Sequence, residues 1–379
     1  MRVQLAAAGT GLLAILYVAG RWPSFVEQLF VERLGPRLTA IVAAPVARAP
    51  ICLAEWLEAA AGVVVLAFVV ATVAEIVRAR GKRLAVAGRA LASSWAVVAW
   101  VLVAFELMWG MAYARPAAED RFGFREPGEQ LAPLRADELE RLAILFVDRS
   151  NALYLQLHGG WPDAYAATTT DASWLELDAA IDRGWERMAP AMGLHPSVAA
   201  PRGPAKPLKS SVLFSWLGIG GFYFPFTGEA NINVDAPEWQ LPHTIAHEKA
   251  HQRFVASENE ANFHGWLACI WSDDPFVRYG GWMFAQRQVL RALAKADPLL
   301  FSRTIRRRLP GVQRDVDIAH AFWTGYDGPL ERVGDTINNT YLRINAVPGG
   351  IRSYSRSVEL IVALTRERSP TDLGYTSAP

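Results

Sequence analysis

The segment from Leu241 to Phe254 reads LPHTIAHEKAHQRF and contains the pattern HExxH, with His247, Glu248 and His251 at its fixed positions. Residues four apart share one face of an α-helix, so both imidazoles of this pattern can reach one metal ion. Glu248 is turned by about 100° from His247, so it can address a metal-bound water without being a ligand. The segment therefore predicts a helix that carries a hydrolytic metal centre.

Two imidazoles do not complete such a centre, because a catalytic zinc ion usually has three protein ligands and one open position. Downstream, the sequence SENEAN runs from Ser257 to Asn262. Ser257 with Glu260 three residues later is a capping-box pattern, which predicts that a second helix begins here. Residues 252–257 can turn the chain back, so that Glu258 or Glu260 supplies the third ligand. We favour Glu258, because the cap would occupy Glu260.

Two runs of aromatic and β-branched residues precede the HExxH segment, FYFPF at 222–226 and ANINV at 230–234. The intervening Thr-Gly predicts a hairpin or a bent strand. We interpret the second run, with Glu229, Asn231 and Asn233, as an edge strand against which an extended peptide substrate could pair. The alternative is that this strand serves only as core or edge structure.

The N-terminal part of the chain is strongly apolar, and the whole sequence is 52% hydrophobic but only 20% charged. A helix needs about 20 apolar residues to cross a bilayer. Three segments meet this need, namely Val3–Gly20, Ala59–Ala74 with apolar flanks, and Ala90–Ala114. The first could instead be a signal peptide, but it lacks a convincing small-x-small cleavage site before Arg21. We therefore predict a three-span transmembrane anchor over residues 1–114.

The loop between the second and third segments is basic. It carries Arg78, Arg80, Lys82, Arg83 and Arg89, with no acidic residue among them. Cytoplasmic loops of membrane proteins are enriched in Lys and Arg. We therefore expect this loop to be cytoplasmic and the chain after Ala114 to lie on the other side, with the lipid bilayer as a partner.

Charge and cysteine content exclude several classes of protein. Lys and Arg number 38 against 37 Asp and Glu, which leaves a net charge of +1 and no field that favours nucleic acid. The chain has 2 cysteines, too few for a disulfide scaffold or a Cys-rich zinc module. We expect no nucleic-acid partner.

The predicted fold class is mainly α, with three N-terminal transmembrane helices followed by an α+β domain. Residues 115–135 are rich in Pro, Gly and charge, which predicts a linker. Residues 136–379 are long enough for one well-packed core. This domain is expected to hold a small edge-strand sheet and a helical C-terminal half, since the chain after Pro242 reads as helical almost to its end.

A hydrolase also needs a donor for the developing oxyanion. The C-terminal helices offer four candidates, His320, Tyr341, Arg343 and Tyr354. The sequence does not choose among them, and for each of them alone a structural role is the simpler interpretation.

Several motifs together resemble a bacterial membrane family catalogued as domain of unknown function 3810. They are GGFYFPFTGEAN at 220–231, HEKAHQ at 247–252, ENEANF at 258–263, YLR at 341–343 and GIRSY at 350–354. The resemblance spans most of the chain and implies three N-terminal spans followed by a domain similar to gluzincin metallopeptidases, a zincin-like fold. In gluzincins the first acid of ExxA(D/N) binds zinc and the residue four further on supports a zinc histidine, which implies these roles for Glu258 and Asn262. The family commonly has glycine at the position of Phe254.

The predicted function is that of a membrane-anchored zinc metallopeptidase. His247, His251 and Glu258 would hold zinc, and Glu248 would act as base and then as proton donor to the leaving amine. The substrate would be a peptide or protein of the cell envelope. The resemblance implies a bacterial cytoplasmic membrane, with the catalytic domain on its extracytoplasmic side.

Two alternatives remain at this point. The first is a catalytically inactive, zinc-stabilised membrane protein that binds peptides or partner proteins. Glu248 argues against it, because a structural zinc site has no use for a base and tends to be closed by a fourth ligand. The second is a membrane scaffold without metal, in which the histidines are ordinary helix residues.

Overall fold

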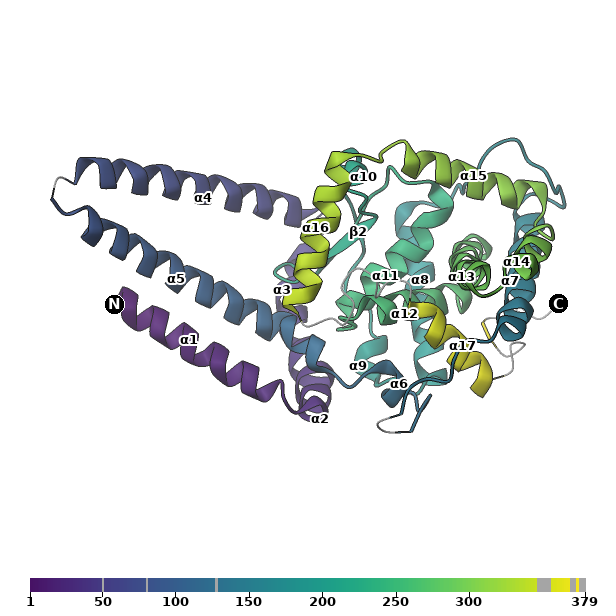
Figure 1. The fold of residues 1–379 in the computed structure, drawn as a ribbon, viewed down its shortest axis with the longest axis horizontal. Coiled ribbons are helices and arrows are strands. Elements are labelled where there is room, and N and C mark those ends of the chain that lie inside the picture. Colours follow the sequence, from purple (N-terminus) through teal and green to yellow (C-terminus); the bar gives the residue numbers. More distant parts are fainter. Residues whose placement is uncertain (50, 80, 127–128, 346–355, 369–372, 375–379) are drawn as a thin grey trace. The chain divides into compact units, whose positions relative to one another are not determined.

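The structure is a computed structural model that describes residues 1–49, 51–79, 81–126, 129–345, 356–368 and 373–374. The chain is mainly helical and has one small three-stranded sheet (Figure 1), as predicted. It divides into two compact units. The first comprises Met1–Arg115 and Phe224–Glu229, and the second comprises Pro116–Tyr223 and Ala230–Pro379.

The first unit consists mainly of helices. Its elements are α1 (Arg2–Ala19), α2 (Pro23–Phe25), the π-helix η1 (Val26–Leu34), α3 (Gly35–Ala47), α4 (Leu53–Arg78), α5 (Arg83–Met108) and the 3-10 helix η2 (Gly110–Ala114). Three of them, α1, α4 and α5, are long and apolar enough to cross a membrane. This confirms the three predicted segments and is consistent with a membrane protein.

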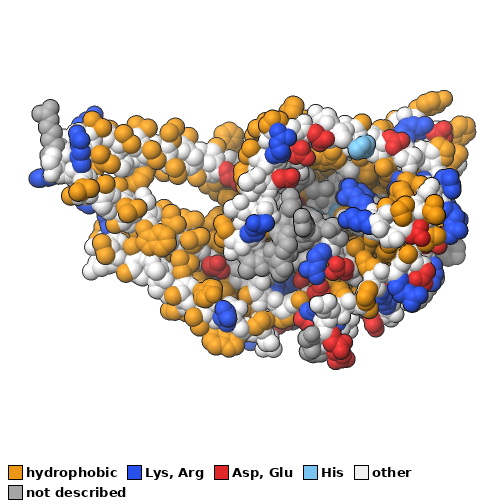
Figure 2. Space-filling view, viewed as in Figure 1, with side chains coloured by type: hydrophobic (Ala, Val, Ile, Leu, Met, Phe, Trp, Pro, Cys, Tyr) orange, Lys and Arg blue, Asp and Glu red, His pale blue; other side chains and the backbone are white. Residues whose placement is uncertain are grey.

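The surface of these long helices is apolar along their length. Figure 2 shows hydrophobic side chains covering α4 and α5, and basic side chains gathered where the chain turns from one to the other. α1 packs along α5, and Gly9 permits a close approach there, since a Cβ at Gly9 would lie 2.9 Å from the Cβ of Ala99. The helices thus keep apolar surface for lipid on most sides.

The first unit also holds the turn Phe224–Glu229, which comes from a distant part of the sequence. The carboxylate of Glu229 is buried and accepts the backbone N–H groups of Leu53 and Ala54 at 3.0 and 2.8 Å. The first N–H groups of a helix have no intrahelical partner and carry partial positive charge. Glu229 therefore caps α4, while its predicted role in substrate binding stays a prediction.

The second unit contains helices and short strands before the HExxH segment and only helices, among the described residues, from that segment onward. The first group is α6 (Ala118–Arg121), α7 (Ala136–Leu157), α8 (Trp174–Ala191), α9 (Pro196–Ala199), β1 (Lys206–Pro207), α10 (Ser211–Trp216), β2 (Gly221–Phe224), β3 (Glu229–Ile232) and η3 (Glu238–Gln240). The second group is α11 (Leu241–Gln252), α12 (Glu258–Ile270), α13 (Pro275–Ala296), α14 (Pro298–Ile305), α15 (Pro310–Thr324), α16 (Pro329–Ile344) and α17 (Ser357–Glu367).

Helix α12 lies at the centre of this unit. Every residue of α12 except Asn259 is buried, and the helix packs against α8, α11 and α13. Large aromatic side chains fill the spaces between these helices, among them Phe146, Trp185 and Trp266. A helix buried on all sides cannot shift without opening the core, so α12 is a rigid support for residues at its start.

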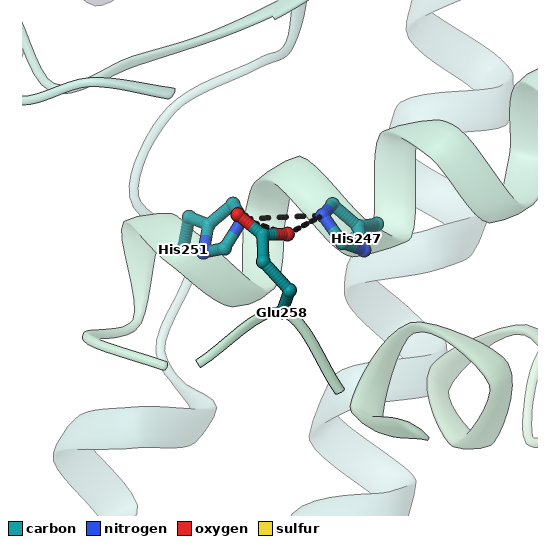
Figure 3. Close-up of side chains that lie close together, drawn as sticks. All are labelled: His247, His251 and Glu258. Carbon is teal, nitrogen blue, oxygen red and sulfur yellow. Dashed lines mark hydrogen bonds and ion pairs between the residues drawn. The ribbon is translucent and has the colours of Figure 1, made fainter. Parts of the chain in front are cut away.

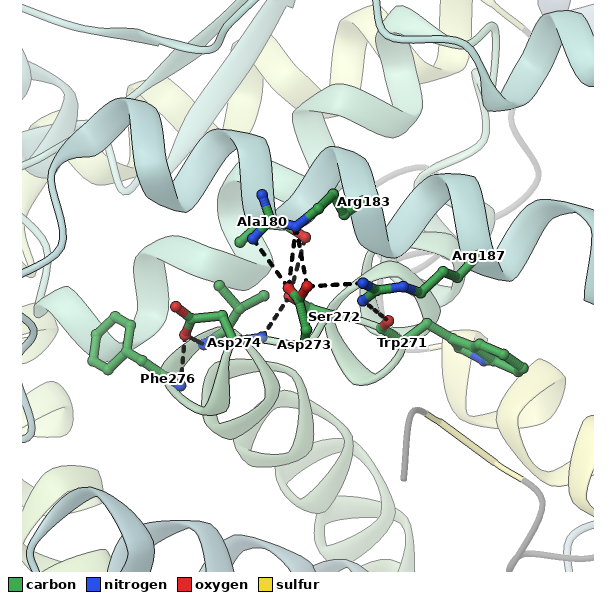
Figure 4. Close-up of polar contacts among 9 residues, drawn as sticks. Ala180, Arg183, Arg187, Trp271, Ser272, Asp273, Asp274 and Phe276 are labelled. Carbon is green, nitrogen blue, oxygen red and sulfur yellow. Dashed lines mark hydrogen bonds and ion pairs between the residues drawn. The ribbon is translucent and has the colours of Figure 1, made fainter. Parts of the chain in front are cut away.

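Charged contacts fix α8 to the junction of α12 and α13 (Figure 4). Arg183 and Arg187 of α8 both reach the carboxylate of Asp273, at 3.1 and 2.8 Å. The hydroxyl of Ser272 donates to the carbonyl of Ala180 at 3.0 Å. Asp274 then caps α13 by accepting two backbone N–H groups of its first turn.

The sheet has the order β1-β3-β2, with β1 parallel to β3 and Lys206 opposite Asn231. The predicted hairpin is confirmed, since β2 and β3 are neighbours joined by a turn over residues 225–228. The prediction of an edge strand at the second run is wrong, because β3 lies between the other two strands. The proline-rich segment before α10 supplies β1, which covers the outer side of β3, and leaves β2 at the edge.

Candidate metal centre

Helix α11 carries both histidines of the HExxH pattern. Pro242 stands at its start, where a missing N–H is tolerated and the fixed φ favours the helix. The helix ends at Gln252, and Phe254 then takes φ 61°, the single positive φ among non-glycine residues that the structure describes. This left-handed turn costs a residue with a Cβ about 1–2 kcal/mol. It explains why the resembling family commonly has glycine here, and in this chain the ring of Phe254 is fully buried instead.

Helix α12 begins at Glu258, which confirms that a second helix starts there. The predicted capping box is wrong, because the Ser257 side chain makes no cap bond and contacts the side chain of Asn259. Glu260 instead accepts the backbone N–H of Ala118 at 3.1 Å and pairs with Arg121. Both partners come from segment 115–135, which was predicted as a linker. Glu260 is thus engaged away from the histidines, and Glu258 is the acid that reaches them.

A glycine lets α12 lie directly on the backbone of α11. A Cβ at Gly265 would come within 3.0 Å of the His247 nitrogen and 3.2 Å of its Cα. Both are backbone atoms that cannot rotate away. This close crossing, two turns after Glu258, brings the start of α12 to the histidine face of α11. Sequence reasoning missed Gly265. The only sequence signal for its role is that a glycine stands inside an otherwise regular helix.

Three side-chain atoms converge between the two helices (Figure 3). The Nε2 atoms of His247 and His251 lie 3.1 Å apart, and Oε2 of Glu258 lies 3.1 Å from the first and 3.5 Å from the second. Tetrahedral zinc with bonds of about 2.0–2.1 Å holds its ligands about 3.3 Å from one another. The spacing of the three atoms therefore fits such an ion, and the group could bind a metal.

The other ring nitrogens fix the tautomer of each imidazole. Nδ1 of His247 lies 2.9 Å from the Asn262 side-chain oxygen, and Nδ1 of His251 lies 2.6 Å from the Val255 carbonyl. Both partners are acceptors, so each Nδ1 carries the proton and each Nε2 presents a lone pair. Two lone pairs and a carboxylate oxygen then face one another, an arrangement that is stable only with a positive charge among them, either a proton or a metal ion.

The charges of the site agree with this requirement. Burial disfavours the charged form of His251, but the Glu258 carboxylate outweighs it and raises the pKa of His251 to about 9. Burial likewise disfavours ionised Glu258, but the imidazoles hold its pKa well below the usual range. Without metal, the pair retains a proton at neutral pH, in the place where a metal ion would carry the positive charge.

Glu248 lies beside the three ligands and is not one of them. Its side chain is buried, and among the described residues its Oε2 has no hydrogen-bond partner. Burial raises the pKa of this carboxyl. The backbone of β2 passes directly over it, because a Cβ at Gly221 would lie 2.9 Å from the Glu248 Cγ. An unengaged, desolvated carboxylate of this kind is suited to accept and return a proton.

The opposite face of α11 is held by a buried ionic network. Lys249 is fully buried and donates to Asp178 and Asp182 of α8 at 2.7 and 3.0 Å. Arg253 pairs with Asp182 at 2.8 Å, and its guanidinium lies 4.7 Å from the centre of the Trp185 ring. Sequence reasoning missed this network. The sequence signal for this network was a pair of acids four residues apart on α8, matched by a pair of bases four residues apart on α11 and directly after it.

The remaining predicted residues lie elsewhere. Asn231 is buried in β3, and the buried Asn233 donates to the Ser215 hydroxyl and the Ile219 carbonyl. The oxyanion candidates His320, Tyr341 and Arg343 are exposed, on α15 and α16. Tyr354, the fourth candidate, lies outside the described residues.

Among the comparisons with known proteins, only the comparison with family models gives a match. No curated protein and no solved structure matches the chain. The model of one family, described as Protein of unknown function (DUF3810), matches residues 31–362, a span that includes His247, His251 and Glu258. Because this match covers most of the sequence, the chain belongs to the family of unknown function DUF3810.

Proposed function

We propose that this protein is a membrane-anchored, zinc-dependent metallopeptidase with a zincin-like domain. The observation that carries the proposal is the meeting of two Nε2 lone pairs and one carboxylate beside an unengaged Glu248. His247, His251 and Glu258 would hold the ion. Three protein ligands are the number typical of catalytic zinc sites, which keep one position for a water or a substrate, whereas structural sites usually have four.

Zinc would supply the Lewis acid, which lowers the pKa of a bound water to about 7 and polarises a carbonyl. Glu248 takes the proton of the attacking water and returns it to the leaving amine. Burial raises the pKa of this carboxyl, which makes it a better proton acceptor than an exposed glutamate. Asn262 and the Val255 carbonyl hold the two imidazoles in the tautomer that presents Nε2 to the ion.

The edge strand β2 is the proposed place for a peptide substrate. β2 ends the sheet order, and among the described residues no strand pairs with its outer side. An extended peptide adds readily to such an edge through backbone hydrogen bonds. Gly221 of β2 lies against Glu248, so a peptide on this edge would pass close to the proposed base. In this proposal β2, and not β3 as the sequence suggested, is the strand that pairs with an extended peptide substrate.

The membrane assignment supports an envelope substrate. The basic turn between α4 and α5 would face the cytoplasm, which sets the second unit on the extracytoplasmic side of a bacterial cytoplasmic membrane. A peptide or protein of the envelope would then be the substrate.

The test uses the full-length chain in lipid nanodiscs. Zinc content is measured by elemental analysis, and hydrolysis is measured by mass spectrometry on a mixture of unstructured peptides. We expect about one zinc ion per chain and cleavage that a chelator abolishes. Glu248→Gln should retain zinc and lose cleavage by about 100-fold or more. Asp148→Asn, which removes an exposed carboxylate paired with Arg307, is the matched control and should change neither.

Other outcomes separate the alternatives. Bound zinc together with cleavage that Glu248→Gln leaves intact would reject this mechanism. Bound zinc with no cleavage of any peptide would favour a zinc-stabilised protein that binds peptides or partner proteins. Less than about 0.2 zinc per chain at neutral pH, where the ligands can bind, would remove the enzyme proposal altogether.

A further inference from the structure

One side of helix α16 is apolar and exposed. Its apolar side chains lie three or four residues apart and therefore form one stripe along the helix. The stripe consists of Leu330, Val333, Ile337, Tyr341 and Ile344. Each is exposed, and Ile337 and Ile344 expose 62% and 78% of their surface. A helix of a globular domain normally turns such a stripe toward a core.

A different side of α16 attaches the helix to the second unit. Leu342 is fully buried. Gly334 lies against the carbonyl oxygen of Leu217, where a Cβ would come within 2.2 Å. The contact of α16 with Leu217 is therefore made at Gly334, which is not part of the apolar stripe.

The neighbouring helix α10 also exposes apolar side chains. Leu217 directly follows α10, so its contact with Gly334 sets α10 beside α16 (Figure 1). α10 exposes three apolar side chains of its own, Val212, Leu213 and Trp216. We call the exposed apolar side chains of α16 and α10 the α16–α10 patch. Apolar side chains exposed together on two neighbouring helices mark a place of contact with a partner or a membrane.

The composition of the patch matches the interface of a lipid bilayer. Aliphatic side chains form most of it, and Trp216 and Tyr341 add the two residue types that gather at the headgroup level of membranes. The exposed polar side of α16 carries Arg332 and Asp335. A helix with one aliphatic face and one charged face lies in the plane of the interface, with its apolar face among the acyl chains.

The rest of the chain provides the bilayer. Three helices of the first unit are long and apolar enough to cross a membrane, so the same polypeptide is tethered to a lipid surface. A tethered patch meets that surface at high effective concentration and needs little area to stay there. A stable protein partner needs about 20–30 residues per side, far more than the patch offers.

We propose that the α16–α10 patch lies in the headgroup region of the membrane that the N-terminal helices span. The patch would give the second unit a preferred face toward the lipid. This proposal goes beyond the peptidase function and does not depend on it, since it rests on the exposed apolar surface and not on the metal centre.

The test places a fluorescent probe on the stripe of the full-length chain. Ile337→Cys is labelled with the environment-sensitive dye NBD, and the chain is reconstituted in nanodiscs of phosphatidylethanolamine and phosphatidylglycerol, with and without lipid-borne nitroxide. Thr336→Cys is the matched control, because Thr336 is adjacent in sequence and exposed on the polar side. The native thiols of Cys52 and Cys269 are buried, and the unsubstituted chain measures any labelling of them.

At Ile337→Cys we expect blue-shifted emission and at least about twofold quenching by the lipid nitroxide, as for a residue among acyl chains. At Thr336→Cys we expect quenching by aqueous iodide and little by lipid. Equal iodide quenching at both positions would overturn the proposal. It would also fail if the probe at position 337 were shielded from both quenchers, since another part of the chain would then cover the stripe. Self-quenching that grows with two chains per nanodisc would assign the stripe to a second copy.

Discussion

Helices α4 and α12 show two opposite ways of being stable. In α4, none of the apolar window is buried inside the protein, and its side chains are aliphatic on every side. In α12, two acids, an asparagine and a histidine are buried together with the apolar residues. Lipid would accept any apolar surface, so the apolar window of α4 is suited to a bilayer by its composition. A protein core accepts polar groups only with partners, so α12 depends on specific contacts.

The largest expected effect comes from removing one partner in the core around α11. Asp182→Ala leaves Lys249 and Arg253, both fully buried, short of a negative charge, which typically costs about 3–5 kcal/mol. Chemical unfolding of the second unit, followed by tryptophan fluorescence, measures the change. Asp148→Ala breaks an exposed pair with Arg307 and should cost no more than about 1 kcal/mol. Equal losses in the two variants would contradict the comparison.

The turn after α11 gives the next largest effect. Phe254→Ala should lose about 3–5 kcal/mol, because the whole ring is buried. Phe254→Gly loses the same ring but relieves the left-handed φ of 61°, so it should be about 1 kcal/mol more stable than the alanine variant. Thermal unfolding of both variants checks this order. A glycine variant less stable than the alanine variant would show that the backbone at Phe254 is not strained.

Paired glycine substitutions test α12 against α4 directly. Gly265→Ala pushes α12 off the His247 backbone, which should cost about 1–3 kcal/mol and lower the zinc content. Gly62→Ala on α4 meets nothing within 4 Å and should leave the zinc content unchanged. Elemental analysis of both variants measures the difference. Full zinc content in Gly265→Ala would mean that the helix crossing does not position Glu258.

The smallest predicted effect is a pH dependence. The pKa of His251 is raised to about 9, so its pairing with Glu258 stabilises the metal-free chain below about pH 6.5 and is lost as pH rises toward 9. A metal must displace that proton, so zinc affinity should rise about tenfold per pH unit up to about pH 9. Zinc titration of chelator-stripped protein at several pH values measures the slope. A flat profile would show that no proton leaves on binding.

Local patterns predicted much of this molecule. Continuous apolar runs predicted the three long N-terminal helices, and the i, i+4 histidines with the acid that follows predicted the group His247, His251 and Glu258. The hairpin was also readable, because it depends on residues close in sequence. The start of α12 was predicted at the right place, although the capping box from which it was inferred does not form. In each case the physical cause, a helical face or a turn, spans only a few residues.

Contacts between residues that are distant in the sequence could not be predicted from local patterns. Glu229 caps a helix that begins at Leu53, and Glu260 binds Ala118 instead of closing a capping box with Ser257. No pattern near either acid indicated these partners. The prediction that β3 is an edge strand failed for the same reason. Its outer neighbour β1 comes from a proline-rich segment that has no strand pattern. A local pattern indicates which contacts a residue is able to make, and the tertiary fold determines which partner it contacts.

The cap on α4 has a practical consequence for handling the protein. A soluble fragment that starts near Pro116 would still contain the turn Phe224–Glu229, but the N–H groups that satisfy the buried carboxylate of Glu229 would be gone. Such a truncation exposes an apolar turn and leaves the carboxylate of Glu229 without these hydrogen-bond donors. A fragment of the second unit without the three long apolar helices would therefore need a redesigned turn and not only a shorter gene.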